Sequence, residues 1–124
     1  MIPYGRQSIT DEDIDAVVAV LKSDYLTQGQ MVPAFEQGLA DYCQAPHVIA
    51  CSNGTTALHL ACAALELGAD DWVWVSAVSF VASANCARYC GAQVDFVDVE
   101  PETGNLCVAA LREKLQGVQG SPRQ

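Results

Sequence analysis

Basic residues are scarce in this 124-residue sequence. Lysine and arginine together number 6, against 15 aspartates and glutamates, so the formal net charge is −9. A protein that binds nucleic acid or an anionic membrane surface needs a basic face. The composition therefore argues against both partners, whereas a few oriented backbone amides still allow an acidic protein to bind one phosphorylated small molecule.

Long apolar runs and paired cysteine motifs are also missing. No run approaches the roughly 20 residues that cross a bilayer, and we expect neither a membrane span nor a leader. The six cysteines form no C-x-x-C, and the two histidines complete no zinc spacing. Cys86 and Cys90 share a helix face, which we interpret as core packing rather than a soft-metal site. These features predict no metal site and a reduced, cytoplasmic setting.

Apolar periodicity and turn residues define the expected elements. Thr10 is a candidate N-cap, and Asp13 follows it at the spacing of a capping box. The pattern predicts helices over 8–24 and 34–43, a strand over 47–51, a helix over 55–67, a strand over 72–77, a helix over 79–90, a strand over 93–99, a helix over 107–115 and a polar, disordered tail over 116–124.

From residue 47 onward, strands and helices alternate. This order predicts an α/β fold with a mostly parallel sheet, right-handed crossovers and covering helices. Strands as apolar as these should be covered on both faces. Because only three strands are predicted, we expect a truncated architecture.

A polar run, Ser52 to Thr56, follows the first predicted strand. Ligands of open parallel sheets bind beyond the carboxyl ends of the strands, where the next helices begin and offer unpaired N–H groups. Gly54 leaves the backbone accessible, and the two threonines after it add hydroxyl donors. We predict that this run binds a monophosphate or pyrophosphate. This stretch alone favours the alternative, a plain helix cap by Ser52 or Asn53.

Phe80 stands at the start of the next predicted helix, again after a strand. A buried aromatic there can stack on a flat cofactor ring whose phosphate binds at residues 54–56. A simple core phenylalanine explains the same position equally well.

Four stretches together resemble the DegT/DnrJ/EryC1/StrS family of sugar aminotransferases: LTQGQMVPAFE, CSNGTTALHLA, SFVASANCARYCGAQVDFVDV and TGNLCVAALREKL. Members are pyridoxal-phosphate enzymes of the aspartate-aminotransferase fold, a type I transferase. The resemblance runs from Ile2 to Leu115 and implies that residues 1–115 are the N-terminal portion of the large domain. Residues 2–29 and 80–99 resemble in particular the branch that aminates a UDP-linked 4-keto sugar on the route to pseudaminic acid.

The resemblance also implies roles for individual residues. Gly54, Thr55 and Thr56 match the loop that binds the cofactor phosphate, and Phe80 matches the aromatic that stacks on the pyridine ring. The positions that match the lining of the nucleotide-sugar pocket are Tyr4, Asp24, Tyr25, Leu26 and Thr27.

The catalytic groups of the family do not match any residue of this chain. The lysine that forms the Schiff base and the aspartate that pairs with the pyridine nitrogen lie further along in family members, and the cofactor chemistry needs both. The two lysines present, Lys22 and Lys114, are predicted to be solvated helix residues. We therefore assign no catalytic residue and expect the 124-residue chain alone to be inactive.

For the complete enzyme, the resemblance implies a homodimer that transfers an amino group from an amino-acid donor, glutamate, to a 4-keto nucleotide sugar. Two alternatives stay open. A few relatives are sugar dehydratases in which histidine replaces the active lysine. The chain can also be an inactive remnant or a binding module without enzymatic activity.

Overall fold

The computed structural model describes residues 5–117. The chain divides into two compact units, with the boundary between Ala50 and Cys51. The helices of the first unit are α1 (Asp11–Leu21) and α2 (Met31–Cys43). The second unit contains α3 (Gly54–Ala64), β1 (Trp72–Ser76), α4 (Ala82–Tyr89), β2 (Gln93–Val97) and α5 (Val108–Gly117).

The predicted capping box of α1 is confirmed. The Thr10 hydroxyl accepts the Asp13 amide at 3.3 Å, and the Thr10 amide donates to the Asp13 carboxylate at 2.8 Å. The helix α2 begins at Met31, three residues earlier than predicted, and so includes Pro33 in its first turn. Proline is tolerated there because the first-turn N–H groups have no partner within the helix.

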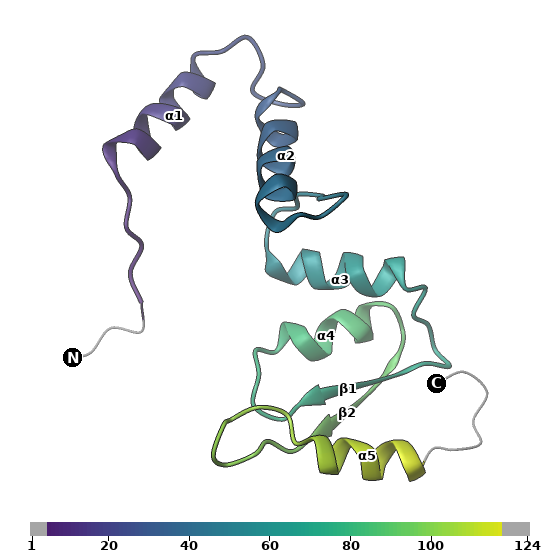
Figure 1. Ribbon diagram of the computed structural model, residues 1–124. Helices are drawn as coiled ribbons and strands as arrows, with labels where there is room; N and C mark the ends of the chain where they lie inside the picture. The colour runs from purple at the N-terminus through teal and green to yellow at the C-terminus, as the bar shows by residue number, and fades with distance from the viewer. Residues whose placement is uncertain (1–4, 118–124) are drawn as a thin grey trace. The chain divides into compact units, whose positions relative to one another are not determined.

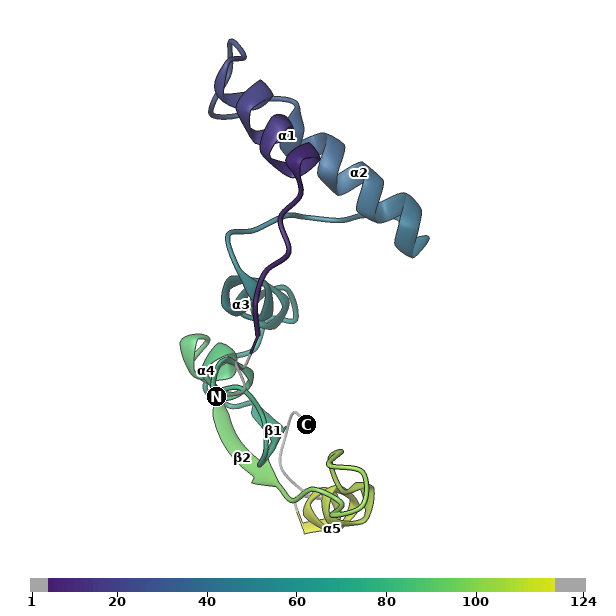
Figure 2. The ribbon, with the colours of Figure 1, turned by 90° about the vertical axis from the view of Figure 1, so that its left-hand side faces the viewer.

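The second unit has the predicted α/β character. Its two strands pair in parallel, in a register that places Trp72 opposite Gln93 and Ser76 opposite Val97. Figures 1 and 2 show α4 against one face of this sheet and α5 against the other, with α3 packed on the outer side of α4. The chain thus forms a β–α–β unit with covering helices, the arrangement that parallel strands require.

The strand predicted over 47–51 is wrong. Within residues 5–117, each of the two strands pairs only with the other, so this segment has no strand alongside it. Its Ala50 amide donates instead to the Glu36 carboxylate at 2.8 Å, and Ile49 is 79% exposed. An apolar β-branched segment becomes a strand only when a neighbour completes its ladder. The described sheet therefore has two strands rather than three.

Several element ends also differ from the prediction. The helix α3 stops at Ala64 because Glu66 takes a left-handed backbone conformation (φ 57°), ahead of the Gly68 expected to end it. β2 stops at Val97. α5 extends to Gly117, two residues into the predicted tail, and the rest of that tail lies outside the described residues.

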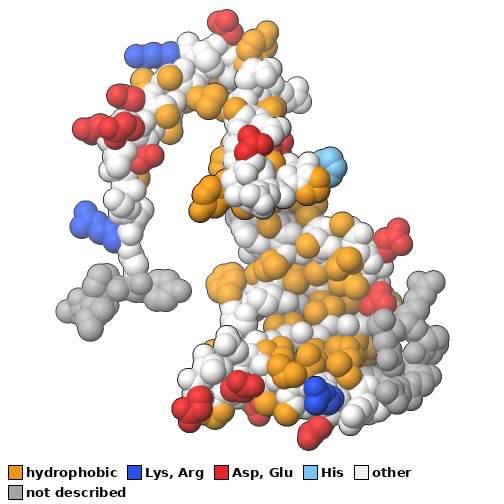
Figure 3. Space-filling view, in the orientation of Figure 1, with side chains coloured by type: hydrophobic (Ala, Val, Ile, Leu, Met, Phe, Trp, Pro, Cys, Tyr) orange, Lys and Arg blue, Asp and Glu red, His pale blue; other side chains and the backbone are white. Residues whose placement is uncertain are grey.

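The core of the second unit is small and built largely from small side chains. Its buried members come from α4, the sheet and the connection between α4 and β2: Val75, Ala82, Cys86, Ala87, Ala92 and Val97. Many larger apolar side chains are exposed, and Figure 3 shows them gathered over α3, α4 and the sheet. In the described part of the chain, no helix has the length and apolar character needed to cross a membrane.

Candidate functional site

The first turn of α3 contains a helix cap built by Asn53. Its side-chain oxygen accepts the Thr56 amide at 2.9 Å and the Thr56 hydroxyl at 3.2 Å. The Asn53 amide in turn donates to the Ser52 hydroxyl at 3.1 Å. The plain cap that the sequence offered as an alternative is therefore present, and it occupies both donors of Thr56.

Two backbone amides at this helix end stay available. Neither the Gly54 nor the Thr55 N–H has a hydrogen-bond partner among residues 5–117. The partial positive charge of the helix N-terminus is concentrated on such unpaired amides. A Cβ atom built on Gly54 would meet no protein atom within 4 Å, so the space beside this glycine is open. Unpaired N–H groups at a helix start, beside open space at a glycine, are the features of an anion site.

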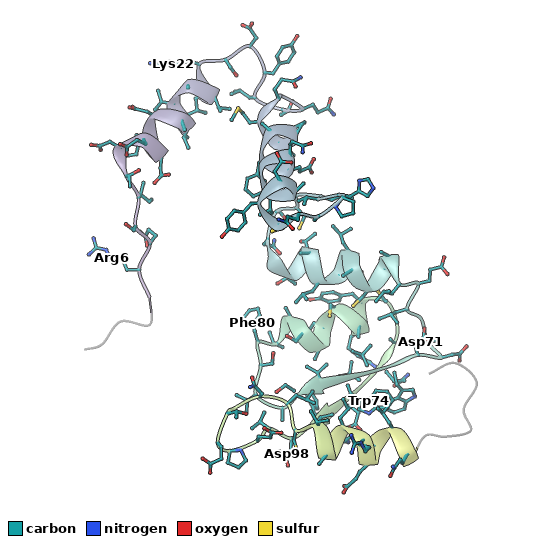
Figure 4. All side chains as sticks on the ribbon, viewed as in Figure 1. Arg6, Lys22, Asp71, Trp74, Phe80 and Asp98 are labelled. Carbon is teal, nitrogen blue, oxygen red and sulfur yellow. The ribbon has the colours of Figure 1, made fainter. Side chains whose placement is uncertain are left out.

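Phe80 lies at the start of α4, at the same end of the second unit as the first turn of α3 (Figure 4). Its side chain is 73% exposed, so Phe80 is not buried as expected and is not a core phenylalanine, while its predicted role in stacking on a cofactor ring stays a prediction. Beside it, the Ser79 and Ser83 hydroxyls are 2.9 Å apart. The exposed Phe80 ring thus lies in the connection between the carboxyl end of β1 and the start of α4.

Both lysines of the chain lie on elements other than α3 and α4. Lys22 is the C-cap of α1 in the first unit. Lys114 lies on α5 and its Nζ is 2.5 Å from the Asp95 carboxylate. The prediction that Lys114 is simply solvated is wrong, since its side chain is only 35% exposed and is ion-paired.

The predicted sugar-pocket residues lie in the first unit. Residues 24–27 form the exposed connection between α1 and α2. Tyr25 lines a mainly apolar hollow of about 350 Å³ together with residues of α1 and the first residue of α2. Tyr4 lies outside the described residues. The structure therefore groups 54–56 with Phe80 in one unit and residues 24–27 in the other.

Sequence reasoning missed a group of side chains where α3 packs on α4. His59 and Tyr89 stack edge to face with ring centroids 5.3 Å apart, and burial, with smaller contributions from Cys86 and Cys90, raises the pKa of Cys62 to about 11. The sequence did contain a signal for this group. His59 and Cys62 are three residues apart, as are Cys86 and Tyr89, and residues at this spacing lie on the same face of a helix. Within the described residues, no three His, Cys, Asp or Glu side chains are arranged to hold a metal ion.

Comparisons with known proteins agree with this geometry. A sequence model of the DegT/DnrJ/EryC1/StrS aminotransferase family matches residues 7–119. GDP-perosamine synthase of Caulobacter vibrioides is 44% identical over 111 residues, which are 89% of this chain and 30% of that protein. UDP-4-amino-4,6-dideoxy-N-acetyl-beta-L-altrosamine transaminase of Campylobacter jejuni is 37% identical over 93% of this chain and 30% of its own length.

Solved structures give the same result. A protein of Streptococcus pneumoniae named as a sugar aminotransferase, in its PLP-form, superposes with a TM-score of 0.85 at 31% identity over 90% of this chain and 29% of its own. GDP-4-keto-6-deoxy-D-mannose-3-dehydratase of E. coli, with bound hydrated PLP, gives 0.84 at 29% identity over 96% and 31%. This chain therefore belongs to the DegT/DnrJ/EryC1/StrS aminotransferase family and has the α/β fold of its PLP-dependent members. It spans about 30% of the length of the relatives it matches.

Proposed function

From this family membership, we propose that the chain supplies the phosphate-binding end of a pyridoxal-phosphate site in a nucleotide-sugar aminotransferase. The observation that carries the proposal is the first turn of α3, where the Gly54 and Thr55 amides have no partner within residues 5–117 and the Cβ side of Gly54 is open. The proposed reaction moves an amino group from glutamate to a 4-keto nucleotide sugar. We further propose that the complete enzyme is a cytoplasmic homodimer.

The residues of the helix start fit a phosphate group. The Gly54 and Thr55 amides act as donors to two phosphate oxygens, and the Thr55 hydroxyl adds a third. Thr56 joins the set through its hydroxyl once this group turns from Asn53. Asn53 keeps the Thr56 amide satisfied and so fixes the direction of the first turn. No lysine is needed, because the helix end itself provides the positive field.

Phe80 fits the ring of the same cofactor. Its exposed side chain lies at the same end of the unit as the first turn of α3, so a ring anchored by its phosphate can stack on it. When bound, pyridoxal phosphate supplies an electron sink for the amino transfer. The contribution of this chain is to hold the phosphate, to orient the ring and to shield one ring face from water.

The residues predicted to bind the nucleotide sugar belong to the N-terminal part of the chain. We propose that Tyr4 and the 24–27 connection line the nucleotide-sugar pocket, with Tyr25 as an aromatic wall. The two relatives differ in nucleotide, since one name contains GDP and the other UDP. We favour a UDP-linked sugar of the pseudaminic-acid type, on the likeness of residues 2–29 and 80–99 to that branch.

Two other functions compete with this one. Sugar dehydration is supported by the likeness to the E. coli dehydratase. A binding role without catalysis is supported by Lys114, the one lysine of the second unit, which lies on α5 and is ion-paired with Asp95. We therefore propose that the 124-residue chain alone does not catalyse transamination, and that it retains only the anchor for the phosphate.

The anchor is tested by titrating the ¹⁵N-labelled chain with pyridoxine phosphate, which has the ring and phosphate of the cofactor but no aldehyde that could react with lysines. We expect the Gly54 and Thr55 amide signals to shift, and pyridoxine without phosphate to leave them unchanged. The G54A variant places a methyl group in the open space and should weaken binding about tenfold, the effect of losing one charge-assisted hydrogen bond.

Two variants complete the design. G38A adds a Cβ that also meets no protein atom within 4 Å, so it controls for the added methyl group and should bind normally. F80A should weaken pyridoxine phosphate but leave inorganic phosphate unaffected. Equal binding of pyridoxine and its phosphate, or shifts confined to other residues, would contradict the proposal.

A further inference from the structure

A single hydrogen bond holds the segment that leads from α2 toward the first turn of α3. The amide of Ala50 donates to Oε1 of Glu36 at 2.8 Å, although the two residues are 14 positions apart in the sequence. Of the backbone amides in residues 46–53, only this one has a partner within residues 5–117. Ala50 is the last residue of the first unit, and the proposed phosphate-binding amides begin shortly after it, at Gly54.

The end of α2 turns the chain back along that helix, toward Glu36. Gln44, the C-cap of α2, takes a left-handed conformation (φ 53°), and the Ala45 amide donates to the Ala40 carbonyl at 2.9 Å. Ala40 and Glu36 lie on one face of the helix, because they are one turn apart. The returning segment is therefore held at its two ends, while a hollow of about 430 Å³ lies between its middle and α2.

The bond to Glu36 does more than satisfy a backbone amide. Ala50 itself is only half-buried, and its neighbour Ile49 is 79% exposed, so water is close to this stretch of backbone. An amide beside water finds an acceptor at little cost in free energy. Water cannot fix the position of the backbone, whereas a side chain carried by a helix can. The carboxylate of Glu36 therefore supplies direction to a segment that has no strand alongside it.

We propose that Glu36 is a positioning residue for the cofactor phosphate, because it fixes Ala50 and so orders residues 51–53 where they enter the first turn of α3. The inference rests on the proposed function, since it takes this turn as the phosphate site. The ordered stretch ends at Asn53, whose side chain caps the Thr56 amide. Ordering loose backbone costs free energy, and a segment that is ordered before the ligand arrives avoids this loss on binding.

Three substitutions of Glu36 separate the hydrogen bond from the charge. E36Q keeps an acceptor oxygen at the same reach but removes the charge, and it should bind pyridoxine phosphate within about twofold of the wild type. E36D keeps the charge on a side chain one methylene shorter, which cannot reach the Ala50 amide. E36A removes the acceptor. Both E36D and E36A should bind pyridoxine phosphate about tenfold more weakly, the effect of losing one hydrogen bond to a charged group.

Q37A is the matched control. Gln37 follows Glu36 on α2 and donates to the Asp41 carboxylate at 2.7 Å, so this variant removes a side-chain hydrogen bond of the same helix and leaves the Ala50 bond in place. It should bind normally. Both tryptophans of the chain lie in β1, so their fluorescence in urea reports the unfolding of the second unit. A weaker affinity with an unchanged urea midpoint distinguishes positioning from a loss of structure around the phosphate site.

NMR titration of the ¹⁵N-labelled full chain with pyridoxine phosphate gives the affinities, and hydrogen exchange of the Ala50 amide reports the bond itself. Exchange at Ala50 should be faster in E36A and E36D but near normal in E36Q and Q37A.

The outcomes separate this inference from the proposed function. If the wild type does not bind pyridoxine phosphate, the proposed function fails and this inference fails with it. If the wild type binds and E36A binds equally well, only the role of Glu36 is overturned. Unchanged exchange at Ala50 in E36A, or an E36Q variant as weak as E36A, would overturn that role as well.

Discussion

Lys114 and Asp95 form an ion pair between α5 and the sheet, with Nζ 2.5 Å from the carboxylate oxygen. Asp95 lies opposite Trp74 in the strand register, and the two tryptophans of β1 line a hollow of about 200 Å³ beside the pair. Lys114 is the only lysine after residue 22. The second unit thus uses its one lysine to attach α5 to the sheet.

Removing the Asp95 charge should reduce stability in a pH-dependent way. The hydrogen bond from Lys114, followed by that from the Phe96 amide, holds the pKa of Asp95 below its ordinary value. A depressed folded-state pKa gives stabilisation that is present above the unfolded pKa, about 3.9, and is lost as the pH falls through the folded pKa. We expect D95N to lower the melting temperature at neutral pH and to flatten its decline in acid.

The measurement is thermal unfolding by circular dichroism over a series of pH values. D98N is the matched control, because Asp98 is an exposed carboxylate that follows the same strand, and its side chain has no partner in the described part of the chain. Identical acid profiles for wild type and D95N would show that the ion pair makes no contribution.

Asn53 variants should separate helix capping from anion binding. N53A removes the acceptor for the Thr56 amide and should cost about 1 kcal/mol in the free energy of unfolding. N53D keeps an acceptor for that amide but adds a negative charge beside the free amides of α3. Urea unfolding should therefore show near-normal stability for N53D, while NMR titration shows weaker phosphate binding. S52A is the control, and normal phosphate binding by N53D would contradict the anion site.

Thr10 should control the ionisation of Asp13. Hydrogen bonds from the Thr10 amide and then from its hydroxyl lower the pKa of Asp13. T10A removes the hydroxyl and should raise this pKa part of the way toward its ordinary value of about 3.9, since the backbone donor remains. The same linkage means that α1 loses stabilisation as the pH falls through the folded pKa of Asp13. A ¹³C NMR titration of the carboxylate measures it, with T27A as the control.

Much of the fold follows from local patterns in the sequence. The Thr10 to Asp13 spacing predicted the start of α1, and alternation after residue 47 predicted parallel strands with covering helices. The strand predicted over 47–51 failed because a strand depends on a neighbour, and local apolarity says nothing about which neighbour is present. The predicted end of α3 was wrong for a similar reason. Glu66 takes a left-handed backbone conformation, which is uncommon for a residue other than glycine and depends on the surrounding structure.

The same distinction between local pattern and three-dimensional context applies to the predicted site. Sequence patterns predicted that Gly54 would begin a helix and that Phe80 would lie near the start of the next one, and α3 and α4 begin there. The strand predicted before Gly54 is absent, so its predicted position at the end of a strand is not confirmed. The acceptor of each hydrogen-bond donor could not be predicted, because the Thr56 amide and hydroxyl could donate either to a ligand or to the capping side chain of Asn53. The contact of His59 with Tyr89 depends on how α3 packs on α4, which no local pattern in the sequence encodes.

Val97 should be a sensitive point of the fold, because it is the one large side chain that is fully buried in the described residues. V97A removes two methyl groups from a core otherwise made largely of small residues, which leaves few neighbours able to fill the space. We expect a loss of about 2 kcal/mol in the free energy of unfolding, the transfer term plus a cavity term. V78A removes the same atoms from a side chain that is 70% exposed and should change stability little. Urea denaturation of both variants measures the difference, and equal losses would mean that the packing of β2 against its covering helices does not hold the second unit together.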